Sequence, residues 1–200
     1  MVDLIKQLEK FNNIGDCEFS HILYKTHVPS VAPRAYLTVI FKPVPAELRE
    51  RRMQHLGFPH SLREFYKMYN GAHLFNGTIN IFGLLPDTYF LDRANWFEKG
   101  LPLNVLEINQ EYKADLKKRG LVCFADYGSD RSLVCMDKGS ESIICFVGED
   151  FENRRMAWPG LDEWLRTEIQ RLSMYFDRSG KLILASDELL LPGTESRTSQ

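Results

Sequence analysis

Apolar residues recur at helical spacing in five segments of the chain, and capping residues mark where several of these segments begin or end. Pro45 suits the first position of a helix, and Gly57 suits the position just after its end. Gly120 closes another segment in the same way. The five predicted helices cover residues 4–11, 45–56, 61–69, 104–119 and a long stretch that begins near Pro159.

The segment over residues 61–69 carries the most distinct helical signal. Ser61 is followed three residues later by Glu64, which is the spacing of a capping box. Its apolar stripe consists of Leu62, Phe65, Tyr66 and Tyr69. Asn70 and Gly71 end the segment, and Gly71 is predicted to take the left-handed conformation that closes the helix.

The last predicted helix has a continuous apolar side, so it is expected to pack against a sheet. That side consists of Leu161, Trp164, Leu165, Ile169, Leu172 and Phe176. Trp158, just before this helix, is a large apolar side chain expected where sheet and helix meet.

Alternating or β-branched apolar runs predict the strands. They cover residues 36–41, 78–84, 121–125, 133–136 and 143–147, with one further short run at 182–184. Short turn sequences separate the three central runs, and Gly128 lies in the first of these turns. Runs joined in this way form an antiparallel meander. The polar tail from Gly193 is expected to be mobile.

Helices at both ends and an antiparallel sheet between them predict a single α+β domain. No internal repeat or low-complexity linker divides the chain. The predicted organisation is an N-terminal extension over residues 1–41, an α+β domain over 42–178, and a C-terminal segment with a flexible tail over 179–200.

Composition narrows the classes of function. At 200 residues and 44% hydrophobic content the chain can bury a core of ordinary size. Its 25 basic and 27 acidic residues give no general attraction for a phosphate backbone, so no nucleic-acid partner is expected. No apolar run approaches the roughly 20 residues that cross a bilayer, and the first residues lack the pattern of a secretion signal. A soluble, cytoplasmic protein is therefore expected.

The four cysteines, Cys17, Cys123, Cys135 and Cys145, form no closely spaced pair. Three of them lie inside apolar runs, where a thiol behaves as a small buried hydrophobe. A disulfide or a nucleophilic thiol beside His73 is the less favoured alternative, because burial suppresses thiol reactivity. A reducing cytoplasm is the simplest setting for this pattern.

No cluster of residues in the sequence indicates a particular reaction. His55, His60 and His73 do not have the spacing of metal ligands on a helix and are expected on the surface. The glycines form no phosphate-binding loop, and adjacent acids such as Glu149 and Asp150 are more typical of solvated turns than of acid–base pairs. No catalytic, cofactor-binding or metal-binding residue is predicted, and an enzyme is the third choice among the functions considered.

Charge is unevenly distributed along the chain. Between Leu121 and Leu165 there are nine acidic and four basic residues, which leaves five negative charges. If the meander turns and the start of the last helix meet in space, they form a negative surface that attracts a basic protein. Scattered charge that serves solubility is the alternative. The candidate partner-binding residues are Asp126, Tyr127, Asp130, Glu149, Asp150, Glu152 and Trp96.

The stretch LGFPHSLREFY over residues 56–66, followed by Tyr69-Asn70-Gly71-Ala72, resembles the SUKH superfamily. These are bacterial immunity proteins related to the fungal cell-wall assembly regulator. Residues 124–128, and Trp158 ahead of residues 161–165, are similar to the middle and closing motifs of the family. The resemblance covers residues 42–175 and implies that the matching positions maintain the fold. These positions are Gly57, Pro59, Asn70, Gly71, Gly128, Trp158 and Trp164.

The resemblance implies a protein that is not an enzyme. It would bind and block a toxin, commonly a nuclease or deaminase, whose active-site region is basic. The alternative is a regulatory or scaffolding module with the same fold, as in eukaryotic members. A toxin gene directly upstream would favour the first function, and an isolated locus would favour the second. The oligomeric state does not follow from the sequence.

Overall fold

The structure, a computed structural model, describes residues 3–8, 22–27, 36–85, 101–177, 182–183 and 191–193. The helices are α1 (Leu4–Leu8), α2 (Ala46–Leu56), α3 (His60–Met68), α5 (Val105–Glu111), α6 (Lys113–Arg119) and α7 (Leu161–Ser173). The strands are β1 (Ile22–His27), β2 (Tyr36–Phe41), β3 (Ala72–Leu74), β4 (Ile79–Ile81), β5 (Leu121–Tyr127), β6 (Ser132–Asp137), β7 (Ile143–Val147) and β8 (Asp150–Trp158).

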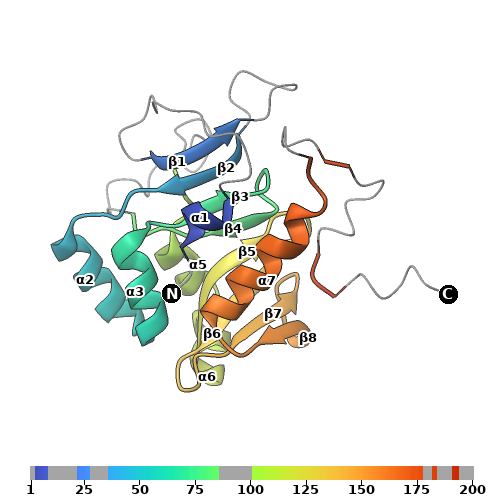
Figure 1. Ribbon diagram of the computed structural model, residues 1–200. Helices are drawn as coiled ribbons and strands as arrows, with labels where there is room; N and C mark the ends of the chain where they lie inside the picture. The colour runs from blue at the N-terminus through green and yellow to red at the C-terminus, as the bar shows by residue number, and fades with distance from the viewer. Residues whose placement is uncertain are drawn as a thin grey trace.

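The eight strands of the described residues form one antiparallel sheet, in which each strand pairs with the next along the chain. Helices α1 and α7 lie in front of this sheet and α5 and α6 lie behind it (Figure 1). Both faces are therefore covered at the centre, where every residue of β5 is buried. This arrangement confirms the predicted α+β fold with an antiparallel meander.

The sheet continues across the domain boundary predicted at residue 42, because β2 pairs with β3. The three predicted segments, 1–41, 42–178 and 179–200, stay predictions. Residues 182 and 183 belong to no named strand, although Leu182 forms an isolated bridge with Phe176. Residue 184 and the tail from 194 onward lie outside the described residues.

Several element boundaries differ from the sequence prediction. Strands β1, β3 and β8 were not predicted; β3 is only three residues long, and β8 is mostly exposed and lacks an apolar alternation. The helix predicted over 104–119 is two helices, because Tyr112 leaves the helical conformation at φ −102° and ψ 25°. Asn104 caps the first of them by accepting a hydrogen bond from Leu106 N, and Gly120 ends the second at φ 67°.

The buried side-chain amide of Asn109 joins α5 to the back of the sheet. The pairing of β5 with β6 shifts register between Cys123 and Ala125, so Phe124 is an extra residue in β5. Asn109 donates to the Cys123 carbonyl at 2.6 Å and accepts from the Cys123 N–H at 3.0 Å. One side chain thus satisfies both backbone groups beside the bulge, while Phe124 packs edge-on against Trp164 on the other face.

The turn between β6 and β7 holds the α2–α3 corner with two opposite charges. Lys138 Nζ donates to the Leu56 carbonyl at 2.8 Å, at the C-terminal end of α2. Glu141 accepts from the backbone N–H groups of His60 and Ser61 at 2.9 and 3.1 Å, at the N-terminal end of α3. Each charge has the sign that stabilises the helix end it meets.

The predicted capping box in α3 is wrong. The helix begins at His60 after Pro59, without a side-chain cap from its own first turn, and Glu64 pairs with Lys67 instead. The cap comes from Glu141, 80 residues further along the chain than Ser61. Residues 61–64 match the capping-box motif, but a residue from a distant segment caps the helix instead.

We expect Glu141→Ala to lower the free energy of unfolding by about 1 kcal/mol, the usual value of a lost N-terminal cap. Hydrogen bonding to Ser61, reinforced by the His60 amide and opposed by partial burial, lowers the pKa of the Glu141 carboxyl. This contribution is present above the unfolded pKa of about 4.3 and is lost as pH falls through the lower folded pKa. Urea unfolding at pH 7 and pH 3 measures it.

The matched control is Glu64→Ala, which removes the carboxylate of the capping box predicted from the sequence. Because Glu64 caps nothing, this change should leave stability nearly unchanged at both pH values. A larger loss for Glu64→Ala than for Glu141→Ala would contradict the assignment of the cap.

Gly71 has the predicted positive φ, at 89°, but it does not close α3. That helix ends at Tyr69 in an extended conformation, and Gly71 follows two residues later. A Cβ on Gly71 would lie 2.5 Å from the Ile81 carbonyl oxygen. Asn70, beside it, accepts a hydrogen bond from Leu84 N at 2.7 Å. The Asn-Gly pair therefore brings two backbone segments into close contact.

We expect Gly71→Ala to cost about 2–3 kcal/mol, because strain in the backbone adds to a clash with backbone atoms that cannot move away. Gly120→Ala is the matched control: its φ is 67°, yet a Cβ there meets nothing within 4 Å. It should cost only about 1 kcal/mol, the conformational penalty alone. Equal losses in urea unfolding would show that the close approach at Gly71 relaxes.

The other predicted fold residues lie where expected. Gly57 ends α2 at φ 61°, and Gly128 lies in the turn between β5 and β6. Trp158 is buried at the end of β8, directly ahead of α7, and Trp164 is fully buried. The apolar side of the last helix is confirmed, since Leu161, Leu165, Ile169, Leu172 and Phe176 are buried as well.

Three cysteines are buried free thiols, Cys123, Cys135 and Cys145. Burial raises the pKa of the Cys123 and Cys145 thiols, which keeps both in the unreactive protonated form. This confirms the reading of these three as core residues. Cys17 lies outside the described residues.

Candidate partner-binding surfaces

Two of the residues predicted to bind a partner lie inside the protein. Asp126 and Tyr127 were expected in an outward turn, but both belong to β5. The Tyr127 hydroxyl donates to Glu168 Oε2 at 2.6 Å beneath α7, and the tyrosine is fully buried. Asp126 is only 9% exposed and accepts from Asn80 Nδ2 at 2.8 Å. Neither side chain is available to a partner at the surface.

Asp126 ends a row of polar side chains that crosses three neighbouring strands. His73 Nδ1 lies 2.8 Å from Asn80 Oδ1, and Asn80 in turn donates to Asp126. Burial raises the pKa of Asp126 to about 6 and lowers the pKa of His73. The expectation that His73 is a surface histidine is therefore wrong; its other ring nitrogen faces the Leu101 carbonyl at 3.3 Å.

The other four predicted acids gather at one end of the sheet, at the β5–β6 and β7–β8 turns. Three of them form ion pairs with arginines. Arg155 contacts Asp130 at 2.6 Å, Arg131 contacts Glu149 at 3.0 Å, and Arg119 pairs with Glu152. The fourth, Asp150, accepts from the backbone N–H of Glu152 at 2.9 Å.

These ion pairs change the charge expected for this end of the sheet. The arginines that neutralise the acids come from α6, the β5–β6 turn and β8, so a count along the chain places only some of them beside the acids. This end of the sheet presents acids and arginines in pairs and not the net negative surface predicted. Ion-paired, positioned side chains favour specificity for one partner over long-range attraction.

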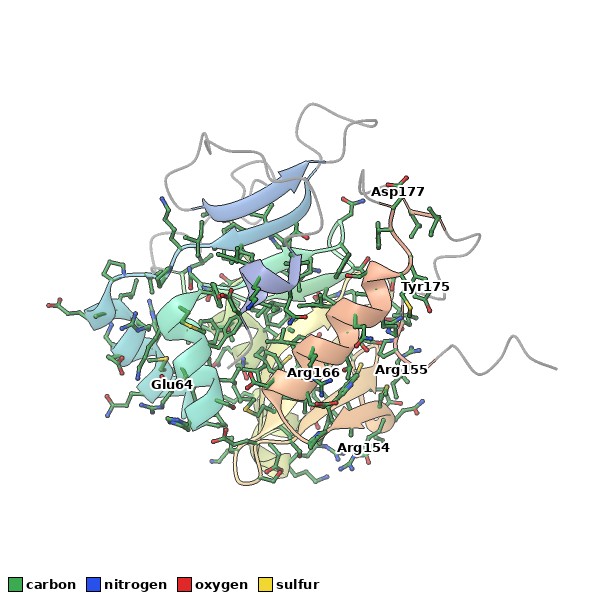
Figure 2. The ribbon with its side chains drawn as sticks, viewed as in Figure 1. Glu64, Arg154, Arg155, Arg166, Tyr175 and Asp177 are labelled. Carbon is green, nitrogen blue, oxygen red and sulfur yellow. The ribbon has the colours of Figure 1, made fainter. Side chains whose placement is uncertain are left out.

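Strand β8, at the end of the strand order, extends this surface of acidic and basic side chains. Most of its residues are exposed, and Met156 is 40% exposed. Figure 2 shows Arg154 and Arg155 near β8, away from Glu64 on α3. We define the β8 surface by a set of exposed and half-buried side chains, which are Arg119, Asp130, Arg131, Glu149, Asp150, Glu152, Arg154, Arg155 and Met156. Trp96, the seventh predicted residue, lies outside the described residues.

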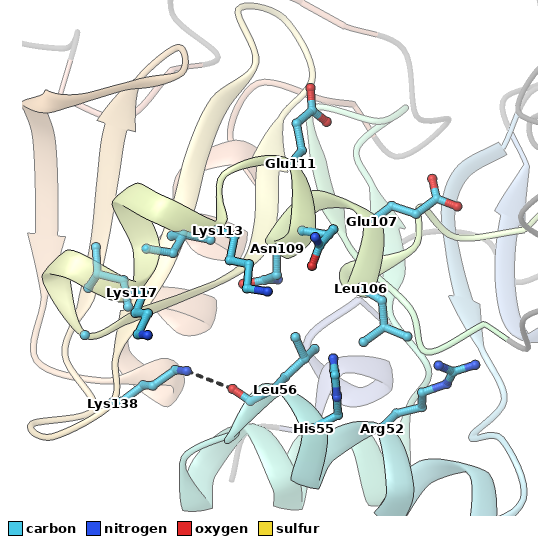
Figure 3. Close-up of a pocket in the computed structure, with 14 residues that line it drawn as sticks. Arg52, His55, Leu56, Leu106, Glu107, Asn109, Glu111, Lys113, Lys117 and Lys138 are labelled. Atoms are coloured by element: carbon cyan, nitrogen blue, oxygen red, sulfur yellow. Dashed lines mark hydrogen bonds between the residues drawn. The ribbon is translucent and has the colours of Figure 1, made fainter.

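A second candidate surface is an open groove between α2 and the α5–α6 pair, with a cavity volume of about 1010 Å³ (Figure 3). Its charged lining residues are Arg52, His55, Glu107, Glu111, Lys113, Lys117 and Lys138. Its apolar lining residues are Leu56, Leu106, Leu116 and Leu121. No local pattern in the sequence indicates this groove, because its walls come from segments about 50 residues apart.

A smaller hollow of about 770 Å³ lies between α3 and the start of α7. Carboxylates from three segments line it: Glu64, Glu141, Asp162 and Glu163. The start of the last helix meets the β6–β7 turn here, which is part of the condition for the negative surface. However, Glu64 pairs with Lys67, Glu163 pairs with Arg166, and Glu141 caps α3. Each of these three carboxylates therefore already has a partner within the protein.

The described residues also contain neither a metal-binding cluster nor a membrane-spanning helix. No group of three or more His, Cys, Asp or Glu side chains there is arranged to hold a metal ion. In the same part of the chain, none of the helices has both the length and the apolar character needed to span a bilayer.

Comparison with known proteins supplies the family. A search of curated proteins finds no match. The sequence model of the SMI1 / KNR4 family (SUKH-1) matches residues 50–167. This range covers more than half of the 200 residues, from inside α2 to inside α7, and includes the Asn-Gly turn and strands β3 to β8. The chain therefore belongs to the SMI1 / KNR4 family (SUKH-1).

Proposed function

We propose that this protein is an immunity protein, which binds a toxin of the nuclease or deaminase type and blocks it without catalysing a reaction. Membership of the SUKH-1 family supports an interaction with another protein. Action in the cytoplasm forms part of the proposal, and the three free buried thiols fit that reducing compartment.

The observation that carries the proposal is the ion-paired β8 surface. A blocking protein must present side chains in fixed positions, because ordering them on binding reduces affinity. The pairs from Arg155 to Asp130 and from Arg131 to Glu149 hold four charged side chains over two turns of the sheet. The exposed Met156 adds apolar area among them. Arginine and methionine are enriched in protein interfaces.

This geometry supports a further proposal about the surface of the toxin. Because acids and arginines alternate on the β8 surface, the complementary face would carry both charges and not only basic ones. The exposed members of the predicted set, Asp130, Glu149, Asp150 and Glu152, stay in the proposal. Asp126 and Tyr127 do not, because they are buried.

The test is growth rescue by co-expression with a toxin of the nuclease or deaminase type that copurifies with the protein from its host, together with a direct binding measurement. We expect the wild type to restore growth. The double variant Asp150→Lys/Arg154→Glu keeps the net charge but inverts the local pattern, and it should bind about tenfold or more weakly. The control, Glu64→Lys/Lys67→Glu, swaps an exposed ion pair on α3 and should bind as the wild type does.

Two outcomes would contradict the proposal. Growth that the wild type does not restore would refute toxin neutralisation. Unchanged binding by the β8 variant, with both variants folded by urea unfolding, would place the interface elsewhere on the molecule.

A further inference from the structure

The groove between α2 and the α5–α6 pair differs in charge from the rest of the molecule. Its lining has four side chains that are cationic at neutral pH, Arg52, Lys113, Lys117 and Lys138, against two carboxylates, Glu107 and Glu111. The lining therefore carries two net positive charges, whereas the whole chain carries a net charge of −2. A local excess opposite to the overall charge is a basis for selecting an acidic partner.

The side-chain directions strengthen this contrast. Figure 3 shows the ammonium groups of Lys113 and Lys117 turned toward α2, and the carboxylates of Glu107 and Glu111 turned away from it. Lys113 and Lys117 are exposed and lie one turn apart on α6. Within the described part of the chain, neither lysine forms an ion pair. Both are therefore able to contact carboxylates of a partner.

The floor of the groove is apolar. Leu106, Leu116 and Leu121 are buried along it, and Leu56 of α2 is partly exposed on the opposite wall. An apolar floor beneath cationic rims suits an amphipathic helix, whose apolar side enters the groove while its acidic side meets the lysines. A nucleic acid would offer no apolar side to the floor, so the phosphates alone would have to supply the affinity.

We propose that this groove binds an acidic amphipathic helix of a partner protein. The proposal does not rest on toxin neutralisation, because no residue that lines the groove belongs to the β8 surface. It adds a second interaction surface, with a partner element of stated chemistry, to the same molecule.

The probe is a synthetic 18-residue helical peptide, about five turns long, with leucines at helical spacing and glutamates on both flanks. Titration into the ¹⁵N-labelled full chain should shift the amide signals of His55, Lys117 and Gly120. Lys113→Glu/Lys117→Glu should weaken binding at least tenfold. The control, Lys118→Glu, makes the same type of substitution at one exposed position of α6 outside the groove, and should weaken binding less than twofold.

The same titration can overturn the proposal. No saturable shift up to millimolar peptide, equal binding to the Lys113→Glu/Lys117→Glu variant, or equal binding of a peptide with lysines in place of glutamates would each refute it. Tighter binding of a 20-nucleotide single-stranded RNA at these residues would identify a nucleic-acid site instead. The Asp150→Lys/Arg154→Glu variant should bind the peptide normally, which separates this result from the fate of the toxin proposal.

Discussion

Replacing Trp164 with alanine is expected to lower the free energy of unfolding by about 3–5 kcal/mol. The side chain is fully buried in α7, at the contact between that helix and the front of the sheet. Its ring meets Phe124 edge-on, with 5.2 Å between ring centroids, and its Nε1 lies 3.4 Å from the Tyr127 hydroxyl. Truncation therefore leaves a large cavity at the centre of the core and removes an aromatic contact.

Urea unfolding followed by circular dichroism measures this loss. Met174→Ala is the control, because Met174 directly follows the same helix but is 62% exposed. It should change stability by no more than about 0.5 kcal/mol. A loss below about 1 kcal/mol for Trp164→Ala would mean that α7 contributes little to the stability of the sheet.

Arg171→Met is expected to have a comparable effect, a loss of about 3–5 kcal/mol, for an electrostatic reason. Glu168 and Arg171 form a buried pair on α7 at 2.6 Å. Burial, together with the nearby Glu168 charge, raises the pKa of Tyr127, so its hydroxyl stays protonated and donates to the same carboxylate. Without Arg171 the carboxylate loses the cation that neutralises it inside the protein.

The double variant Glu168→Met/Arg171→Met provides the decisive comparison. It removes both charges and replaces them with apolar side chains, so it should be more stable than Arg171→Met alone. Urea unfolding of the two single variants and the double variant gives the coupling energy. If the double variant is no more stable than Arg171→Met, the pair does not act as a charge-compensated unit.

Much of the fold follows from short-range patterns. The apolar side of α7, the central strands and the glycines after α2 and α6 all depend on residues a few positions apart. Strand β8 escaped prediction because most of its residues face solvent, and strand signals come mainly from buried alternation. Tyr112 divides α5 from α6 without any glycine or proline to mark the break.

The candidate surfaces were harder to predict for a different reason. An acid cluster in the sequence becomes a negative surface only if no cation meets it in space. Arg119 reaches Glu152 from 33 residues earlier, and Arg155 reaches Asp130 from 25 residues later. Tyr127 shows the same effect for burial, because a residue beside a turn glycine was in fact the last residue of a core strand.

The β6–β7 turn, with Lys138 on one helix end and Glu141 on the next, has a consequence for the order of folding. Its partners lie 80–82 residues earlier in the chain. Bringing the corner and the turn together therefore costs the entropy of closing a long loop, and the contacts of Lys138 and Glu141 offset this cost only after the β6–β7 hairpin has formed. We therefore expect the α2–α3 corner to dock late. In the native protein, the amide protons of His60 and Ser61 should then exchange with solvent through the same opening that releases the hairpin tip.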